Sequence, residues 1–126
     1  MKITTFNPQI ITNDAQPLVK LFEELGFEKR HSPKGIGELD VTGIRMKDNN
    51  GFAVDISVPN ADLPQDIASI RMNVDNFEQA YDLLVSHGFR NYYGDHIVQR
   101  DSSKSALMIA PSGFSINLVQ HIKDNK

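Results

Sequence analysis

Leu25-Gly26-Phe27 in the first half of the chain and His87-Gly88-Phe89 in the second half share the pair Gly-Phe. The two glycines lie 88 − 26 = 62 residues apart. Three more residues recur at this offset without a gap: Met46, Gly51 and Phe52 return as Met108, Gly113 and Phe114. Residue class is kept at further positions of the same register, namely Asp14/Asn76, Leu21/Leu83, Phe22/Leu84, Val54/Ile116, Asp55/Asn117 and Ile56/Leu118. Repetition at one fixed offset predicts two tandem copies of a single structural unit.

Each copy is predicted to contain one amphipathic helix. In the first copy we expect Asp14 to cap the helix and Gly26 to end it. The predicted buried stripe of this helix follows the spacing i, i+3, i+4, i+7 and consists of Leu18, Leu21, Phe22 and Leu25. In the second copy Asn76 and Gln79 resemble a capping box, and Gly88 is expected to end the helix. Its predicted stripe consists of Phe77, Ala80, Tyr81 and Leu84.

Alternating apolar and polar residues predict strands on both sides of each helix. Residues 48–51 (DNNG) and 111–113 (PSG) are typical of hairpin turns. The predicted fold class is α+β: tandem βαβββ repeats form a curved mixed sheet around a cleft, with the helices on the outer face. A single domain is expected over residues 1–126, with repeat one at 1–58, a linker at 59–65 and repeat two at 66–121.

Alternation within the strands separates an apolar face from a polar one, because successive side chains of a strand point to opposite sides of a sheet. The side chains predicted to pack under the helices are Phe6, Ile10, Phe52, Val54, Ile56, Val58, Ile70, Met72, Val74, Phe114, Ile116 and Leu118. The opposite face is predicted to carry Thr5, Asn7, Gln9, Asp55, Ser57, Ser69, Arg71, Asn73, Ser115, Asn117 and His121. A solvated sheet face would also give this pattern. The prevalence of Asn, Gln, Ser and Asp over Lys and Glu favours a cleft that the two repeats share.

The composition excludes several classes of protein. Hydrophobic residues make up 40% and charged residues 23% of the chain, which is typical of a globular domain. The absence of cysteine excludes disulfides, thiolate metal ligands and a cysteine nucleophile, and it fits a reducing compartment, so we expect a cytoplasmic protein. Thirteen scattered basic residues against sixteen acidic ones give no footprint for nucleic acid. No segment approaches the ~20 apolar residues of a membrane helix, and the start, MKITTFNPQ, lacks the apolar stretch of a signal peptide.

These features resemble the vicinal oxygen chelate superfamily, which includes glyoxalases, extradiol dioxygenases, fosfomycin resistance enzymes and bleomycin resistance proteins. The resemblance rests on the tandem βαβββ plan, on the helix that runs from Asp14 to Leu25-Gly26-Phe27, and on the Gly-Phe pairs after the hairpin turns. It covers nearly the whole chain. It implies a glyoxalase/bleomycin resistance-like domain and a homodimer, because members of this superfamily often dimerise.

The resemblance also identifies four positions that bear metal ligands in the enzymes of the superfamily, usually two His or Gln and two Glu on the first, fourth, fifth and eighth strands. In this chain they correspond to Asn7, Asp55, Ser69 and Asn117. Only Asp55 is a strong ligand for a divalent metal. A neighbouring register would offer Gln9 and Arg71, and an arginine repels a cation. We therefore expect no metal and no cofactor.

Asp55 and Arg71 are the two charged residues predicted on the polar face. One interpretation is an internal ion pair between them, which would compensate both charges without a ligand. In the other, Arg71 binds the carboxylate or phosphate of a ligand with its planar guanidinium. The predicted ligand-binding residues are Asn7, Gln9, Asp55, Ser69, Arg71, Asn73, Asn117 and His121. Arg45 is a further candidate, but the sequence leaves its face open. No catalytic residue is predicted, because His121 has no orienting partner in the sequence.

Three functions remain open on the sequence. The favoured one is a non-enzymatic, metal-free binding protein similar to bleomycin resistance proteins, with a small polar or anionic ligand in the cleft. The second is a metal-dependent lyase, isomerase or dioxygenase with an atypical site around Asp55 and His121. The third is a dimeric interaction module without a ligand.

Overall fold

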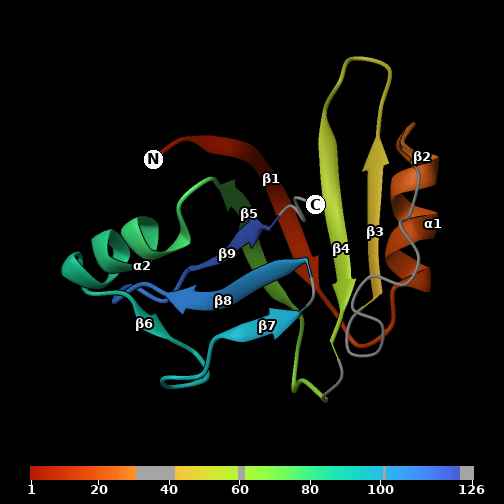
Figure 1. Cartoon of the computed structure of the whole chain (residues 1–126). Coiled ribbons are helices and arrows are strands. Elements are labelled where there is room, and N and C mark those ends of the chain that lie inside the picture. Colours follow the sequence, from red (N-terminus) through yellow and green to blue (C-terminus); the bar gives the residue numbers. More distant parts are fainter. Residues whose placement is uncertain (31–41, 60–61, 101, 123–126) are drawn as a thin grey trace. The chain divides into compact units, whose positions relative to one another are not determined.

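The computed structural model describes residues 1–30, 42–59, 62–100 and 102–122. The described residues form two helices and nine strands (Figure 1). In chain order they are β1 (Ile3–Ile11), α1 (Gln16–Glu24), β2 (Glu28–Lys29), β3 (Thr42–Lys47), β4 (Ala53–Val58), β5 (Ile67–Val74), α2 (Phe77–Ser86), β6 (Arg90–Asn91), β7 (Val98–Arg100), β8 (Ser103–Ile109) and β9 (Ser115–His121). The α+β class is confirmed. Residues 60 and 61 of the predicted linker lie outside the described residues.

The chain divides into two compact units. Asn7–Ala68 form the N-terminal unit, whereas Met1–Phe6 join Ser69–Lys126 in the C-terminal unit. Strand order is β2-β3-β4-β1 in the N-terminal unit and β1-β5-β9-β8-β6 in the C-terminal unit, where β7 also pairs with β8. The β1–β4 and β5–β9 pairs are parallel, and the β2–β3, β3–β4, β6–β8, β7–β8 and β8–β9 pairs are antiparallel. Each unit therefore contains a mixed sheet, and β1 contributes its start to one unit and its end to the other.

The 62-residue repeat is confirmed in the strand pairing. Three pairs of the first repeat, Gln9 with Asp55, Met46 with Val54 and Lys29 with Met46, return 62 residues later as Arg71 with Asn117, Met108 with Ile116 and Asn91 with Met108. The hairpin turns also match, because Asp48 N–H donates to Phe52 O and Ala110 N–H donates to Phe114 O. The two copies thus share one backbone plan, so residues 62 apart can be compared directly.

The second helix begins and ends as the sequence predicts. The side chain of Asn76 accepts a hydrogen bond from the Gln79 N–H, which satisfies one of the free donors at the start of α2. Gly88 follows the helix with φ +93°, a backbone conformation that glycine adopts without strain. The predicted stripe is confirmed: Phe77 and Ala80 are buried, and Tyr81 and Leu84 pack against the same core.

The first helix departs from the prediction at its start and along its face. Ala15, and not Asp14, is the N-cap, and no side chain caps the helix; the Asp14 carboxylate accepts instead from the Gln16 N–H. Leu21 and Leu25 are exposed, so this part of the predicted stripe is wrong. The buried side is formed by Ala15 and Val19, with Leu18 and Phe22 packed against them. Leu18 and Phe22 of the predicted stripe thus still face the core, and Ala15 and Val19 are buried in place of Leu21 and Leu25.

Each unit has its own hydrophobic core under its helix. In the N-terminal unit α1 packs on Met46, Val54 and Ile56, with Ile10, Ile44 and Val58 beside them. In the C-terminal unit α2 packs on Met72, Val74, Ala106, Met108, Ile116 and Leu118, with Ile70 beside them. Three predicted core residues are wrong: Phe6, Phe52 and Phe114 are 59%, 66% and 50% exposed. Phe52 and Phe114 each follow a turn glycine, ahead of the paired part of the strand, and Phe114 contacts the core only through the Phe89 ring at its edge.

Neither described helix is long and apolar enough to cross a membrane.

Candidate functional site

The polar face of the N-terminal unit is formed by alternate residues of three adjacent strands. Val54 and Ile56 of β4 point into the core, so the residues between and after them, Asp55 and Ser57, point to the other face. The strand register sets Gln9 of β1 opposite Asp55 on one side and Arg45 of β3 opposite it on the other. The hairpin thus settles the face of Arg45, which the sequence had left open.

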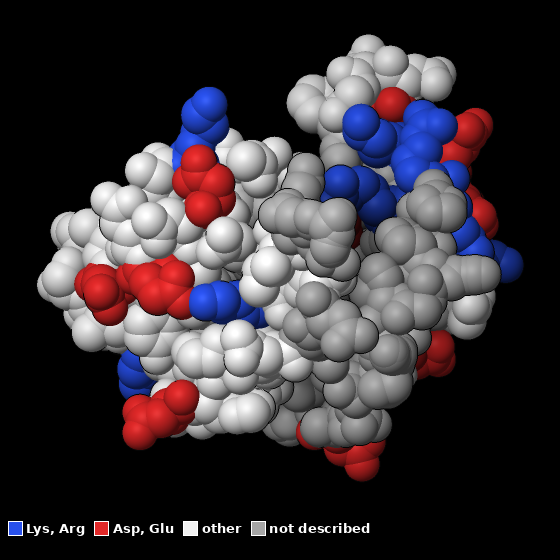
Figure 2. Space-filling model, in the orientation of Figure 1, with Lys and Arg blue, Asp and Glu red and all other residues white. Residues whose placement is uncertain are grey.

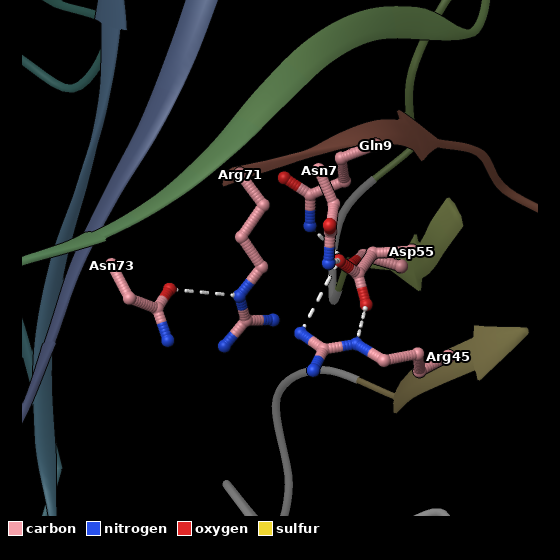
Figure 3. Close-up of polar contacts among 7 residues, drawn as sticks. Asn7, Gln9, Arg45, Asp55, Arg71 and Asn73 are labelled. Carbon is pink, nitrogen blue, oxygen red and sulfur yellow. Dashed lines mark hydrogen bonds and ion pairs between the residues drawn. The ribbon is translucent and has the colours of Figure 1, made fainter. Parts of the chain in front are cut away.

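Asp55 is the centre of this face and is 4% exposed. The Arg45 guanidinium donates from Nε to Oδ1 at 2.8 Å and from Nη2 to Oδ2 at 3.4 Å (Figure 3). Asn7 donates from Nδ2 to Oδ2 at 3.0 Å. A buried carboxylate needs this kind of charge compensation, since an unpaired buried charge is costly. The ion-pair partner that the structure gives Asp55 is therefore Arg45, across a β-hairpin, and not Arg71 as one interpretation of the sequence had it.

Gln9 provides a second, neutral contact on the same face. Its side chain is 1% exposed, and Nε2 donates to Ser57 Oγ at 2.7 Å. Both residues come from adjacent strands whose backbones are in register. The contact fixes the orientation of the Gln9 amide, and a fixed amide can present a defined donor or acceptor to a bound molecule.

The polar face of the C-terminal unit carries the remaining predicted residues. Arg71 is half-buried, and its Nε donates to Asn73 Oδ1 at 3.1 Å (Figure 3). Asn117 lies opposite Arg71 on β9 and is half-buried. Ser69 is buried and donates from Oγ to the Ser115 carbonyl at 3.1 Å. His121 is exposed at the end of β9, at the rim of this face and away from Arg71.

Burial distinguishes these faces from an ordinary solvated sheet face. Six polar side chains on them are buried: Gln9, Asp55, Ser57, Ser69, Asn73 and Ser115. Within the described part of the chain, no buried side-chain nitrogen or oxygen lacks a hydrogen-bond partner. Buried polar groups that are satisfied in this way are rigid and oriented. Such a face differs from an outer surface rich in Lys and Glu, because its polar groups are held in fixed orientations.

The donor set does not fit the metal site of the enzymes that the sequence resembles. The four corresponding positions hold two amides, a hydroxyl and one carboxylate: Asn7, Asn117, Ser69 and Asp55. Divalent transition metals prefer imidazole nitrogen and carboxylate oxygen, and Asp55 already binds the Arg45 guanidinium. Among the described residues, no three His, Asp or Glu side chains are grouped so that they could hold a metal ion.

A separate depression of about 740 Å³ lies along α1 in the N-terminal unit. Its lining includes Asp14, Glu23 and Glu24 against a single basic residue, Lys20. An acidic lining repels anions, and the lining contains none of the predicted binding residues. We therefore do not assign the candidate site to this depression.

Charged side chains are mixed on the face of the molecule that Figure 2 shows. Among the residues drawn in colour, several blue basic side chains gather at the upper right of the view, where red acidic ones lie beside them, and elsewhere single blue and red side chains are interspersed. Binding to nucleic acid depends mainly on clustered positive charge. This distribution agrees with the net charge of −3.

Solved structures share the fold of this chain, although no protein-family model and no curated protein sequence matches it. Methylmalonyl-CoA epimerase from Mycobacterium tuberculosis has a TM-score of 0.64 and 14% identity, over 96% of this chain and 90% of that chain. A glyoxalase/bleomycin resistance protein/dioxygenase superfamily member from Vibrio splendidus 12B01 has a TM-score of 0.59 and 12% identity, over 94% and 99%. A methylmalonyl-CoA epimerase variant from Streptomyces coelicolor, in complex with 2-nitronate-propionyl-CoA, has a TM-score of 0.59 and 16% identity, over 97% and 100%.

The chain therefore has the vicinal oxygen chelate fold that the sequence predicted. At these identities the likeness concerns the fold, and the function has to be argued from the side chains.

Proposed function

We propose that this chain is a metal-independent small-molecule-binding protein of the glyoxalase/bleomycin resistance type, with a small polar or anionic ligand. The observation that supports it is the set of buried, hydrogen-bonded polar side chains on the sheet faces opposite the two cores. Arg71 is the residue that binds the anionic group. The N–H groups of its planar guanidinium match the oxygens of a carboxylate or phosphate, and the hydrogen bond from Nε to Asn73 orients the guanidinium.

On the polar face of the C-terminal unit we assign Ser69, Asn73, Asn117 and His121 as further ligand-binding residues. On the polar face of the N-terminal unit we assign this role to Asn7, Gln9 and Asp55. A protein of the same fold is known in complex with 2-nitronate-propionyl-CoA, so acyl-CoA thioesters are included among the ligands to be tested, beside simple carboxylates and phosphates. We also propose a cytoplasmic homodimer, following the absence of cysteine and the superfamily resemblance.

Native mass spectrometry of gently purified protein, with metal analysis of the same sample, is the first test. The spectra report the mass of the assembly against a 14.1 kDa chain, together with any small molecule that it carries. A small organic adduct without stoichiometric metal supports the proposal. A stoichiometric divalent ion contradicts it and favours a metal-dependent lyase, isomerase or dioxygenase.

Arg71→Gln tests the role of the arginine. The first repeat has glutamine, Gln9, at the equivalent position, so this backbone already accommodates the new side chain. Affinity for the identified ligand should fall about tenfold or more, because a hydrogen bond to a charged group contributes ~1.5–3 kcal/mol. Arg90→Gln, on the exposed start of β6, removes the same charge and is the matched control. Equal affinities of the two variants in titration calorimetry would remove Arg71 from the proposal.

A further inference from the structure

Three charged residues form one row across the N-terminal unit, on its polar face. The β2–β3 pairing sets Lys29 opposite Met46, and the ladder continues with the Arg30 N–H donating to the Arg45 carbonyl at 2.8 Å. Arg30 therefore lies opposite Arg45. Residues opposite each other in adjacent strands share a face, and Arg45 in turn lies opposite Asp55. The row thus reads Arg30, Arg45, Asp55.

This row has an excess of positive charge, because it contains two guanidinium groups and one carboxylate. The row beside it is balanced, since Glu28 lies opposite Lys47. Like charges directly opposite each other in a sheet are destabilising. Arg45 is compensated by Asp55, and Arg30 adds a charge that a bound anion would compensate.

Asp55 also determines which edge of Arg45 is available. It uses the edge formed by Nε and Nη2. In the described part of the chain Nη1 has no hydrogen-bond partner, and the side chain is 37% exposed. The end of the fork, with one N–H on Nη1 and one on Nη2, can therefore bind two oxygens of a carboxylate or phosphate. The buried carboxylate fixes the guanidinium in advance, so little side-chain entropy is lost on binding.

The second repeat shows that the fold does not need these charges. At the equivalent places the Tyr92 N–H donates to the Leu107 carbonyl, also at 2.8 Å, and Leu107 lies opposite Asn117. The three equivalent positions thus hold Tyr92, Leu107 and Asn117, none of which is charged, and the charge of this row is on Arg71, opposite Asn117. A buried ion pair often contributes little to stability compared with uncharged residues, so stability alone does not account for the charged row of the first repeat.

We propose that Arg30 and Arg45 form a second anion-binding site, specific for a carboxylate or phosphate oxyanion and oriented by Asp55. The site lies within the N-terminal unit and goes beyond the proposed role of Arg71, from which it is independent. Arg45 binds the oxyanion through the end of its guanidinium fork, and Arg30 supplies the additional charge.

The test is a titration of the isotope-labelled full chain with inorganic phosphate, and separately with acetate, against sodium chloride at equal ionic strength. The readout is the Nε–H signal of each arginine in a proton–nitrogen correlation spectrum; the chain has five arginines, so the signals can be assigned by single substitutions. We expect saturable shifts of the Arg30 and Arg45 signals with at least one of the two oxyanions, and none with chloride. The comparison of phosphate with acetate identifies the preferred class.

Four variants separate binding from structure. Arg30→Tyr and Arg45→Leu introduce the residues of the second repeat, and each should weaken oxyanion binding; for Arg45→Leu the loss should be about tenfold or more. Asp55→Asn should weaken binding, because the Asn Nδ2 cannot accept the hydrogen bonds that Oδ2 receives from Arg45 Nη2 and Asn7 Nδ2, and the guanidinium loses its fixed orientation. The double variant Arg45→Leu/Asp55→Asn copies the uncharged pair of the second repeat; it should fold with wild-type cooperativity and bind no oxyanion at this row.

The outcomes distinguish this site from the proposed function. Shifts confined to Arg71 would overturn the second site and leave the role of Arg71 intact, whereas shifts confined to Arg30 and Arg45 would do the reverse. If Arg90→Gln weakens binding as much as Arg45→Leu does, the oxyanion responds to overall charge and the site is refuted. If the double variant binds as well as the wild type, the row is structural only.

Discussion

The two repeats share the same strand pairing, but single side chains at equivalent positions differ in charge and in hydrogen-bonding groups. Gln9 and Arg71 occupy the same position, opposite Asp55 and Asn117 respectively. Gln9 is satisfied by Ser57 on the adjacent strand. In the second repeat valine replaces this serine, and Arg71 bonds to Asn73 on its own strand instead. One exchange, of a neutral amide for a guanidinium, thus changes the ligand that the position can bind, because the guanidinium favours an anion.

The helix-ending glycines allow a matched test of backbone strain against crowding. Gly26 and Gly88 have φ values of +103° and +93°, so an alanine at either position is strained and should cost about 1–2 kcal/mol of the free energy of unfolding. A Cβ on Gly88 would also lie 2.8 Å from Cγ of the Pro111 ring, whereas a Cβ on Gly26 would meet nothing within 4 Å. Urea denaturation should therefore show Gly88→Ala to be less stable than Gly26→Ala by about 1 kcal/mol or more. Equal losses would show that the Pro111 loop moves away without cost.

At the scale of elements, one exposed ion pair links α2 to β8 in addition to their packing in the hydrophobic core. Lys104 of β8 donates from Nζ to the Glu78 carboxylate in the first turn of α2, and its ammonium lies 5.6 Å from the centre of the Phe77 ring. The hydrogen bond from Lys104 holds the pKa of Glu78 below its ordinary value of 4.5. Because the pKa is lowered in the folded chain, the pair stabilises the fold above the ordinary pKa, and this contribution is lost as the pH falls through the lowered value.

Lys104→Met tests this contact directly. The midpoint of the Glu78 carboxyl signal in a carbon-detected pH titration should lie below 4.5 in the wild type and move up towards 4.5 in the variant. The effect on stability should be small, because Glu78 is 66% exposed and solvent screens the pair. Lys20→Met, on α1, should leave the Glu78 midpoint unchanged. An unchanged midpoint in Lys104→Met would assign the lowered pKa to the backbone of the helix start.

The sequence predicts these elements well where a local signal agrees with the packing. Asn76 caps α2 because its side chain can reach the Gln79 N–H, and the stripe that follows is buried. For α1 the local signal is misleading: Asp14 is a good capping residue, but the helix starts later and buries Val19 in place of Leu21. Periodicity gives the spacing of a stripe, whereas contact with the sheet decides which of two neighbouring stripes is buried.

The candidate site could be predicted in part for a similar reason. Strand alternation placed Asn7 and Asp55 on one face, and they are hydrogen-bonded. The sequence leaves the face of Arg45 open because the strand does not alternate clearly, although the hairpin turn at residues 48–51 implies that Arg45 lies opposite Asp55. The sequence gives no signal for Arg30, because β2 is only two residues long and too short to show a strand pattern. Pairing between strands carries this information, and a pattern within one strand does not.

At the scale of the whole molecule, β1 belongs to both compact units. Its first residues join the C-terminal unit, and the residues from Asn7 onwards join the N-terminal unit. At its start β1 is attached through the main chain of Lys2. The Lys2 carbonyl accepts from the Asp75 N–H at 3.0 Å, and the Lys2 N–H donates to Asp75 Oδ1 at 2.6 Å. The first residues of β1 therefore pair with β5 of the second repeat, and they do not pair with a strand of the first repeat.

Deletion of residues 2–5 tests this arrangement. The loss of the two hydrogen bonds at Lys2 should lower the free energy of unfolding by about 1–3 kcal/mol, and it should leave β5 as an exposed edge. In hydrogen exchange, the Asp75 amide and its neighbours in β5 should lose protection, whereas amides of β4 should keep theirs. Lys2→Ala is the control, because it keeps both main-chain groups and should change neither value. If β4 and β5 lose protection equally, the two units unfold together and β1 couples them; if neither does, the start of β1 contributes nothing to the stability of the C-terminal unit.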